Sequence, residues 1–140
     1  MELFFMFDTK IAIVLRDDLA PWQALNVTAF LTSGIVAQAS DIIGQPYRDA
    51  AGNVYNPLTI QPMVILAADQ ETLRTIHRRS LERQVTCSAY VEEMFSTGHD
   101  GANREVFAQF SPDTAKLVGL ALRTDKKIAD KITKGAKMHP

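Results

Sequence analysis

The chain has 140 residues, with 15 basic and 16 acidic side chains and a formal net charge of −1. This balance argues against non-specific nucleic-acid binding as the main function, although a local basic patch stays open, and the length fits one domain with its own core. The single cysteine, Cys87, excludes an intramolecular disulfide and fits a reducing cytoplasm.

Residues 1–8 (MELFFMFD) are interpreted as a short apolar leader ahead of the domain. The segment lacks a basic start, a full-length hydrophobic region and a small-residue cleavage site, so we do not expect a signal peptide. An edge strand and a segment packed against a neighbour both fit it. We therefore predict a leader over residues 1–8 and a single domain over residues 9–140.

The first predicted element is a buried strand. Ile11–Leu15 (IAIVL) is an uninterrupted apolar run with β-branched members, which is typical of a strand covered on both faces. It ends in a charged turn, Arg16–Asp18, which we call the elbow. We expect this strand in the middle of a sheet.

A long uncharged helix is predicted after the elbow. Leu19–Ser40 contains no Asp, Glu, Lys or Arg, Pro21 fits the first helical turn, and Asp18 is expected to cap it. Apolar residues cover far more than one stripe, so two faces of the helix need cover. We expect the sheet to cover one face and a second subunit the other, which predicts a homodimer.

A membrane-spanning helix is the alternative, because this uncharged run has 22 residues and spanning helices need about 20. The run also contains Pro, Gln, Asn, Thr, Ser and Gly, which make it too polar for lipid. We expect no membrane contact.

Residues 41–62 predict a hairpin or a structured loop, because they are dense in Gly, Pro, Asn and Asp. Ala51–Asn53 is the expected turn. Tyr47, Arg48 and Tyr55 either line a pocket or pack beside the turn, and packing is the commoner role of aromatic residues there.

The remaining regular elements follow in alternation. Apolar runs predict strands at Met63–Ala67, Val85–Val91 and Lys116–Arg123. Helices are expected from Asp69 to about Glu82 and from a cap at Thr124 or Asp125 to Gly135. Between them, residues 105–114 predict a short helix or a bulged connection.

Several side chains on these elements have structural explanations. His77 follows Leu73 by four residues, which places it at the edge of the core rather than in a ligand set. Cys87 lies in a predicted strand and fits a small core residue better than a nucleophile. The arginines of the second helix alternate with glutamates, so we expect a solvent-facing surface there, with RNA contact as the weaker alternative.

The polar segment Glu92–Arg104 (EEMFSTGHDGANR) follows a predicted strand. Loops at strand ends in α/β proteins are where ligand-binding groups converge. A surface loop with a turn at Asp100-Gly101 explains the composition equally well. Its His, Asp and Glu residues show no recognised ligand spacing, so neither a metal nor another cofactor is expected.

The alternation of strands and helices predicts the fold class. We expect an α/β three-layer sandwich in which a mixed sheet of four to five strands lies between helices.

Two stretches carry a resemblance to known families. Lys10–Leu19 (KIAIVLRDDL) resembles the opening of peptidyl-tRNA hydrolase II, where an Arg-x-Asp-Leu elbow leads into a long helix, and Asp130–Thr133 is similar to that family's last helix. RDDLAPWQALNVTAF and EMFSTGHDGANR together resemble the uncharacterised bacterial family named domain of unknown function 2000. The likeness spans nearly the whole chain after Asp8. It implies a peptidyl-tRNA hydrolase II-like fold, commonly as a homodimer.

The resemblance implies little of the enzyme's chemistry. The Gly-Lys pair at the enzyme's helix start falls on Ala24-Leu25, so its lysine is absent, and its helix glutamine and histidine fall on Ala29 and Thr32. Its Asp-x-x-x-Thr pair is matched by Glu93 and Thr97. True peptidyl-tRNA hydrolysis is therefore not expected.

Two functions are predicted for a cleft between the elbow and the Glu93–Arg104 segment. The favoured one is binding of a polar or anionic small molecule or a peptide, and the alternative is hydrolysis of an acyl or aminoacyl ester. The candidate catalytic residues are Asp18, Glu93 and Thr97, and the candidate ligand-binding residues are Arg16, His99, Asp100, Asn103 and Arg104.

Overall fold

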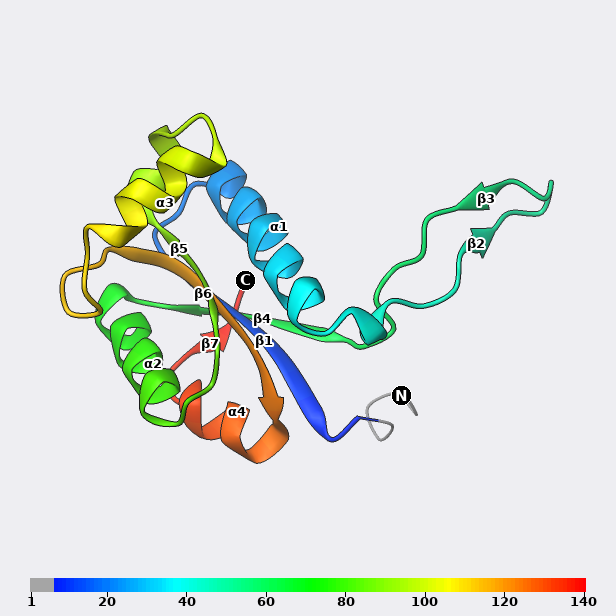
Figure 1. Cartoon of the computed structure of the whole chain (residues 1–140). Helices are drawn as coiled ribbons and strands as arrows, with labels where there is room; N and C mark the ends of the chain where they lie inside the picture. The colour runs from blue at the N-terminus through cyan, green and yellow to red at the C-terminus, as the bar shows by residue number, and fades with distance from the viewer. Residues whose placement is uncertain (1–6) are drawn as a thin grey trace.

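A five-stranded mixed sheet forms the centre of the protein, whose computed structural model describes residues 7–140 (Figure 1). The strand order is β5-β6-β1-β4-β7. The central strand β1 pairs in parallel with β4 and antiparallel with β6, and the outer pairs are antiparallel. The strands are β1 (Thr9–Arg16), β4 (Met63–Ala68), β5 (Ser88–Val91), β6 (Leu117–Asp125) and β7 (Lys137–Met138).

Helices cover both faces of this sheet. On one face, the alternate residues Ile11, Ile13 and Leu15 pack with the buried side of α1 (Pro21–Gln38). On the other face, Ala12 and Val14 join the core of α2 (Gln70–Glu82) and α4 (Lys126–Ile132). The uninterrupted apolar run of β1 is thus used on both sides, and the α/β three-layer arrangement with a mixed sheet is confirmed.

The start of α1 differs from the expectation. Ala20 occupies the N-cap position, and the Gln23 side chain accepts a hydrogen bond from the Ala20 N–H at 3.0 Å. Asp18 does not cap the helix, because it lies two residues before the N-cap, and its carboxylate instead accepts a 2.6 Å hydrogen bond from Nε of Arg16. The carboxylate that was predicted to cap the helix thus pairs with Arg16, two residues earlier in the chain.

Only one face of α1 is covered by the chain itself. Val27, Leu31 and Ile35 are buried against the sheet, whereas Trp22 is 60% and Leu25 is 72% exposed. The prediction that both faces of the uncharged helix are covered is therefore not met within one chain.

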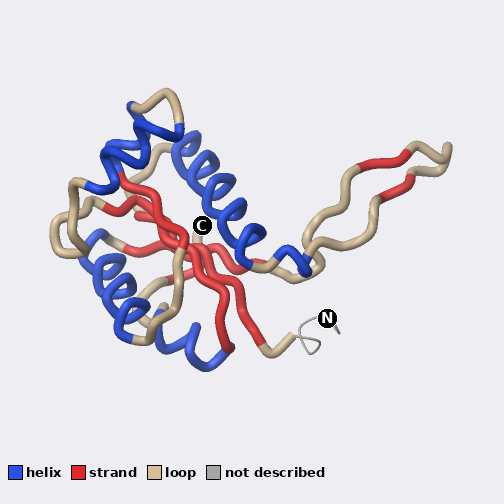
Figure 2. Tube along the Cα trace, viewed as in Figure 1, coloured by secondary structure: helices blue, strands red, loops and turns tan. Residues whose placement is uncertain are grey.

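The predicted hairpin is confirmed and stands apart from the main sheet. Strands β2 (Tyr47–Arg48) and β3 (Val54–Tyr55) form a separate two-stranded ladder. Figures 1 and 2 show it projecting from the end of α1 as an arm. We call residues 43–60 the arm. The expected packing of its two tyrosines is absent, since both are more than half exposed.

Asp49 holds the tip of the arm together. Its carboxylate accepts hydrogen bonds from the backbone N–H groups of Ala51 (3.0 Å) and Asn53 (2.9 Å) and from the Tyr55 hydroxyl (2.8 Å). The Asn53 side chain is a further donor. Hydrogen bonds from Asn53, Tyr55 and Ala51 lower the pKa of Asp49 to about 2, because they favour the ionised form.

The polar Glu92–Arg104 segment is mostly helical rather than a loop. A 3-10 turn, η3 (Glu92–Ser96), precedes α3 (Asp100–Ala108), and only residues 97–99 between them are irregular. The Nδ1 atom of His99 accepts from the Ala102 N–H at 3.1 Å and caps α3. The Asp100-Gly101 pair therefore opens a helix instead of forming the turn of the surface-loop alternative.

Smaller differences lie at the ends of other elements. Strand β5 begins at Ser88, later than expected, and β7 was not predicted. The caps at Asp69 and Asp125 are confirmed, since both side chains accept hydrogen bonds from the first turn of their helices. Within residues 7–140, no helix has both the length and the apolarity to cross a bilayer. Most of the predicted leader, residues 1–6, lies outside the described residues.

Candidate functional site

An open pocket of about 280 Å³ lies between the first half of α1 and the η3–α3 segment. One wall is a helical stripe, since Trp22, Asn26 and Phe30 recur every four residues along α1. The other wall consists of the end of β5 and the segment that follows it. Its lining residues there are Tyr90, Met94, Phe95, Thr97, Gly98, His99, Asp100 and Asn103.

Four aromatic rings form a continuous apolar surface in the pocket. Trp22 meets Phe95 edge-on with a centroid distance of 5.7 Å, and Phe95 lies 5.2 Å from Tyr90. Tyr90 in turn lies 5.7 Å from Phe30. Tilted and edge-on contacts of this kind hold the rings in defined positions. The wall is therefore a preformed surface for a flat apolar group.

Amide and hydroxyl groups surround this aromatic surface. The Tyr90 hydroxyl accepts from the Asn26 side chain at 3.5 Å and donates to the Met94 carbonyl at 3.4 Å. The Thr97 hydroxyl contacts the Met94 carbonyl at 2.9 Å and also the Asn103 side-chain amide. Each amide retains hydrogen-bonding capacity beyond these contacts. The pocket thus offers neutral donors and acceptors beside an apolar wall.

The capping role of His99 determines its tautomer. Because Nδ1 accepts the Ala102 N–H, the proton of the neutral ring is on Nε2. His99 therefore offers a hydrogen-bond donor at its exposed nitrogen.

The pocket carries little net charge. Among its lining residues, Asp100 is the one carboxylate, and none is Lys or Arg. Asp100 Oδ2 pairs with Arg104 Nε at 2.7 Å on the outer surface of α3, where both side chains are mostly exposed. Solvent screens exposed pairs of this kind, so the pair adds little to the stability of the helix.

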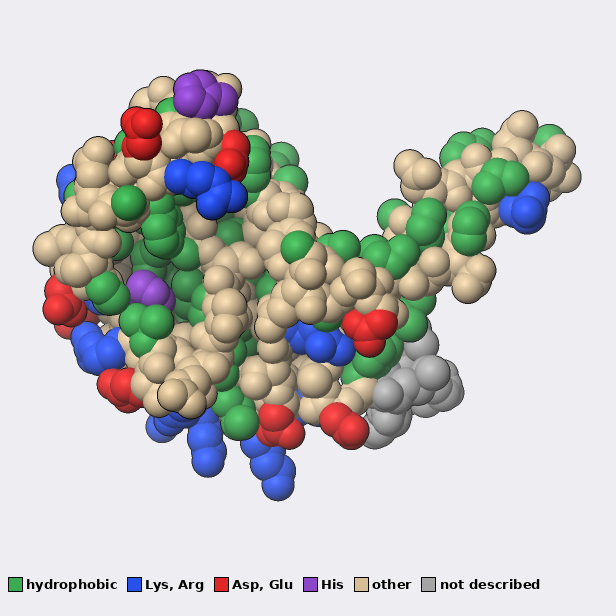
Figure 3. Space-filling view, in the orientation of Figure 1, with side chains coloured by type: hydrophobic (Ala, Val, Ile, Leu, Met, Phe, Trp, Pro, Cys, Tyr) green, Lys and Arg blue, Asp and Glu red, His purple; other side chains and the backbone are tan. Residues whose placement is uncertain are grey.

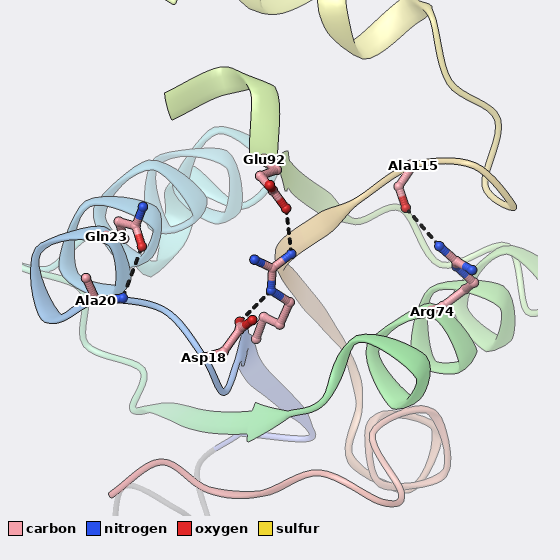
Figure 4. Close-up of polar contacts among 7 residues, drawn as sticks. Asp18, Ala20, Gln23, Arg74, Glu92 and Ala115 are labelled. Atoms are coloured by element: carbon pink, nitrogen blue, oxygen red, sulfur yellow. Dashed lines mark hydrogen bonds and ion pairs between the residues drawn. The ribbon is translucent and has the colours of Figure 1, made fainter. Parts of the chain in front are cut away.

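The elbow forms a separate ionic cluster with Glu92 (Figure 4). Arg16 donates from Nε to Asp18 at 2.6 Å and from Nη1 to Glu92 at 2.9 Å, and its side chain is only 12% exposed. Burial lowers the pKa of Arg16, but the hydrogen bonds to Asp18 and Glu92 outweigh this effect and raise the pKa. The guanidinium of Arg16 is therefore already paired with two carboxylates of the same chain.

The predicted site residues are divided among three places. Thr97, His99, Asp100 and Asn103 line the pocket. Arg16 and Asp18 belong to the elbow cluster, and Arg104 lies outside on α3. Glu93 belongs to none of these three places. It follows Glu92 in sequence, and its Oε1 atom is buried with no hydrogen-bond partner among the described residues.

The pocket also differs in position from the predicted cleft. The elbow and the polar segment do meet, through Arg16 and Glu92, but their contact is an ion pair rather than a cavity. The wall that faces the polar segment is α1 instead. Trp22, Asn26 and Phe30 were not among the predicted residues, although their spacing of four on an uncharged helix was a usable signal.

Within residues 7–140, no group of three or more His, Cys, Asp or Glu side chains lies together in a way that could hold a metal ion.

Fold and pocket together define a small α/β protein with an open pocket beside its first helix. The chain belongs to the family described as "Protein of unknown function (DUF2000)", whose model matches residues 9–140. It is also similar to a solved structure, the protein of unknown function Atu0240 from Agrobacterium tumefaciens strain C58. The two sequences are 74% identical, the TM-score is 0.95, and the match covers 96% of this chain and 100% of the other. A search of curated proteins found no match.

Proposed function

We propose that this protein binds a small polar molecule, or a short peptide segment, that carries amide groups and a flat apolar group. The observation that carries the proposal is the juxtaposition in one pocket of the aromatic surface with the side chains of Asn26, Thr97 and Asn103. Ligand pockets combine an apolar lining with a few well-placed polar groups in this way.

The charges favour an uncharged ligand over an anion. Arg16 is engaged by Asp18 and Glu92, and Arg104 is paired with Asp100. An anion in the pocket would meet the Asp100 carboxylate without a free cation from the lining residues. Neutral amide groups instead match the donors and acceptors that the pocket presents.

Trp22 provides a direct readout, since it is the single tryptophan of the chain and lines the pocket. We expect N-acetylphenylalanine amide to change the Trp22 emission with saturable binding. N-acetylphenylalanine, which differs by a carboxylate in place of the terminal amide, is expected to bind more weakly. The proposal fails if neither compound alters the emission up to its solubility limit.

A matched pair of variants locates the binding site. Asn103→Ala removes an amide that lines the pocket and is expected to weaken binding about fivefold, the effect of one neutral hydrogen bond. Gln109→Ala removes an exposed amide just beyond the same helix and outside the pocket lining. Equal losses of affinity in both variants would contradict the assignment.

Hydrolysis of an acyl or aminoacyl ester is the second candidate, within the peptidyl-tRNA hydrolase II-like fold that we infer from the sequence resemblance. The carboxylate of Glu93 favours it, because its Oε1 atom has no hydrogen-bond partner among the described residues, although this atom is buried and a local rearrangement is needed before a substrate or water can reach it. The absent helix-start lysine opposes true peptidyl-tRNA hydrolysis. Ester turnover that is lost in Glu93→Gln but kept in Glu105→Gln would support this candidate over binding alone.

The setting we propose is the bacterial cytoplasm. The single cysteine and the similarity to a protein from a bacterium support this setting.

A further inference from the structure

The exposed apolar side chains of this protein are concentrated on one part of its surface. Of the thirteen large apolar side chains that are exposed among the described residues, nine lie on α1 or the arm. Figure 3 shows hydrophobic atoms following the arm away from the body. Concentrated apolar surface of this kind marks an interaction site. The nine are Trp22, Leu25, Phe30, Ile43, Tyr47, Val54, Tyr55, Leu58 and Ile60.

Charge is missing from the α1 part of this surface, whereas the arm carries Arg48 and Asp49. The eighteen residues of α1 include no Asp, Glu, Lys or Arg. Helix α2 is a control within the chain, since its thirteen residues carry two glutamates and three arginines. A helix face that meets water is normally charged, and α1 is not. The amino-acid composition of its outer face is therefore typical of a surface that another protein covers.

The arm lacks the support that a hairpin needs. Two-stranded hairpins are marginally stable alone in water, and β2 and β3 pair only with each other. The base of the arm is held by backbone hydrogen bonds, from Gly44 to Leu58 and from Ile60 to Ile42. Its tip is held by Asp49. The side chains between base and tip meet no other part of the described chain that would bury them.

We propose that a second copy of this chain packs in the notch between α1 and the arm, with α1 against α1 in antiparallel orientation and the arm of each copy clasping the other. A second copy supplies both missing partners at once, because a two-fold symmetric interface matches a surface with itself. The nine exposed side chains offer on the order of 800 Å² of surface, at about half exposure each. One partner of a standard interface buries about that area.

This arrangement brings the arm of one subunit to the pocket of the other. The arm begins where α1 ends, and the pocket lies at the start of α1. In an antiparallel pair the end of one helix lies beside the start of its mate. The arm is roughly as long as α1, about 27 Å for each at standard rises per residue. The arm of the partner therefore covers the open side of the pocket, over Trp22.

Sedimentation velocity on the full chain tests the assembly. We expect a dimer at micromolar concentration, and at least a tenfold weaker dimer in Leu25→Lys on α1 and in Leu58→Lys on the arm, which place a charge in the interface. Leu81→Lys, at a similarly exposed leucine on α2, is the matched control and keeps the wild-type affinity. A monomeric wild-type protein, or a dimer that neither interface variant weakens, overturns the proposal.

Acrylamide quenching of Trp22 tests the placement of the arm without any ligand. Leu58 belongs to the arm, which lies beyond the end of α1 (Figure 1), whereas Trp22 lies at the start of that helix. Its substitution therefore reaches Trp22 only through the partner copy. We expect Leu58→Lys, but not Leu81→Lys, to increase quenching by at least twofold at concentrations where the wild type is dimeric. Equal quenching in wild type and Leu58→Lys overturns the placement of the arm. The result does not depend on the proposed ligand.

Discussion

His77 lies half-buried in a hollow of about 460 Å³ between α2, α3 and the start of β5. Its Nδ1 atom is buried and has no hydrogen-bond partner among the described residues. Burial lowers the pKa of His77, because the charged ring loses solvation there. This position agrees with the predicted place of His77 at the edge of the core. The lowered pKa of His77 has a consequence for stability.

The free energy of unfolding should fall on acidification because of His77. Below the ordinary histidine pKa of about 6.5, the unfolded chain takes up a proton that the folded ring resists. The contribution of His77 is thus complete above pH 6.5 and decreases as the pH falls toward the lowered pKa of the folded state. Urea unfolding at several pH values between 7.5 and 5 measures this slope.

Substitution isolates this contribution. His77→Leu should flatten the pH dependence over that interval, whereas His139→Asn, near the C-terminus and outside the hollow, should leave it as in the wild type. An unchanged slope in His77→Leu would show that other groups produce the pH dependence.

At the scale of elements, the contact of α1 with the sheet depends on a glycine. A Cβ at Gly119 of β6 would lie 2.6 Å from Cγ1 of Val27 and 2.9 Å from Cδ1 of Leu31. Both are buried side chains of α1, and non-bonded carbon atoms do not approach one another so closely. The absence of a side chain at this position therefore lets the helix lie close enough to seal the core.

Gly119→Ala is expected to lower the free energy of unfolding by about 1–3 kcal/mol, the usual effect of overpacking a core. The measurement is the urea midpoint at constant slope. Gly98→Ala is the control, because a Cβ at Gly98 would meet no atom within 4 Å. A shift of the same size in both variants would mean that backbone effects, and not the contact with α1, account for the loss.

For the whole molecule, stability should depend on protein concentration if α1 and the arm are covered by a second copy. Association with the folded state alone raises its apparent stability by mass action. We expect the Tm to rise by about 4 °C between 1 and 100 μM for a chain of this size. Leu58→Lys, whose dimer is weaker, should show a smaller rise, and a constant wild-type Tm would contradict a dimer in this range.

Local patterns determined the position and type of most elements. The five apolar residues of Ile11–Leu15 required cover on two sides, and the structure supplies α1 on one side and α2 with α4 on the other. The caps at Asp69 and Asp125 were predictable because a cap depends on residues within one turn of helix. The polar segment before residue 104 was likewise identified from composition, and four of the site residues predicted in it line the pocket.

Only the tertiary structure decided which surfaces meet. Asp18 was lost as a helix cap to Arg16, and Arg16 was drawn toward Glu92, 76 residues away in sequence. The opposite wall of the pocket, from Trp22 to Phe30, depends on how α1 lies across β5 and η3, which a local pattern does not encode. The sequence by itself thus determined the layers and the uncharged character of α1, since these follow from periodicity and composition. The pocket and the free-standing arm follow from contacts between distant residues, which become definite only when the chain has folded.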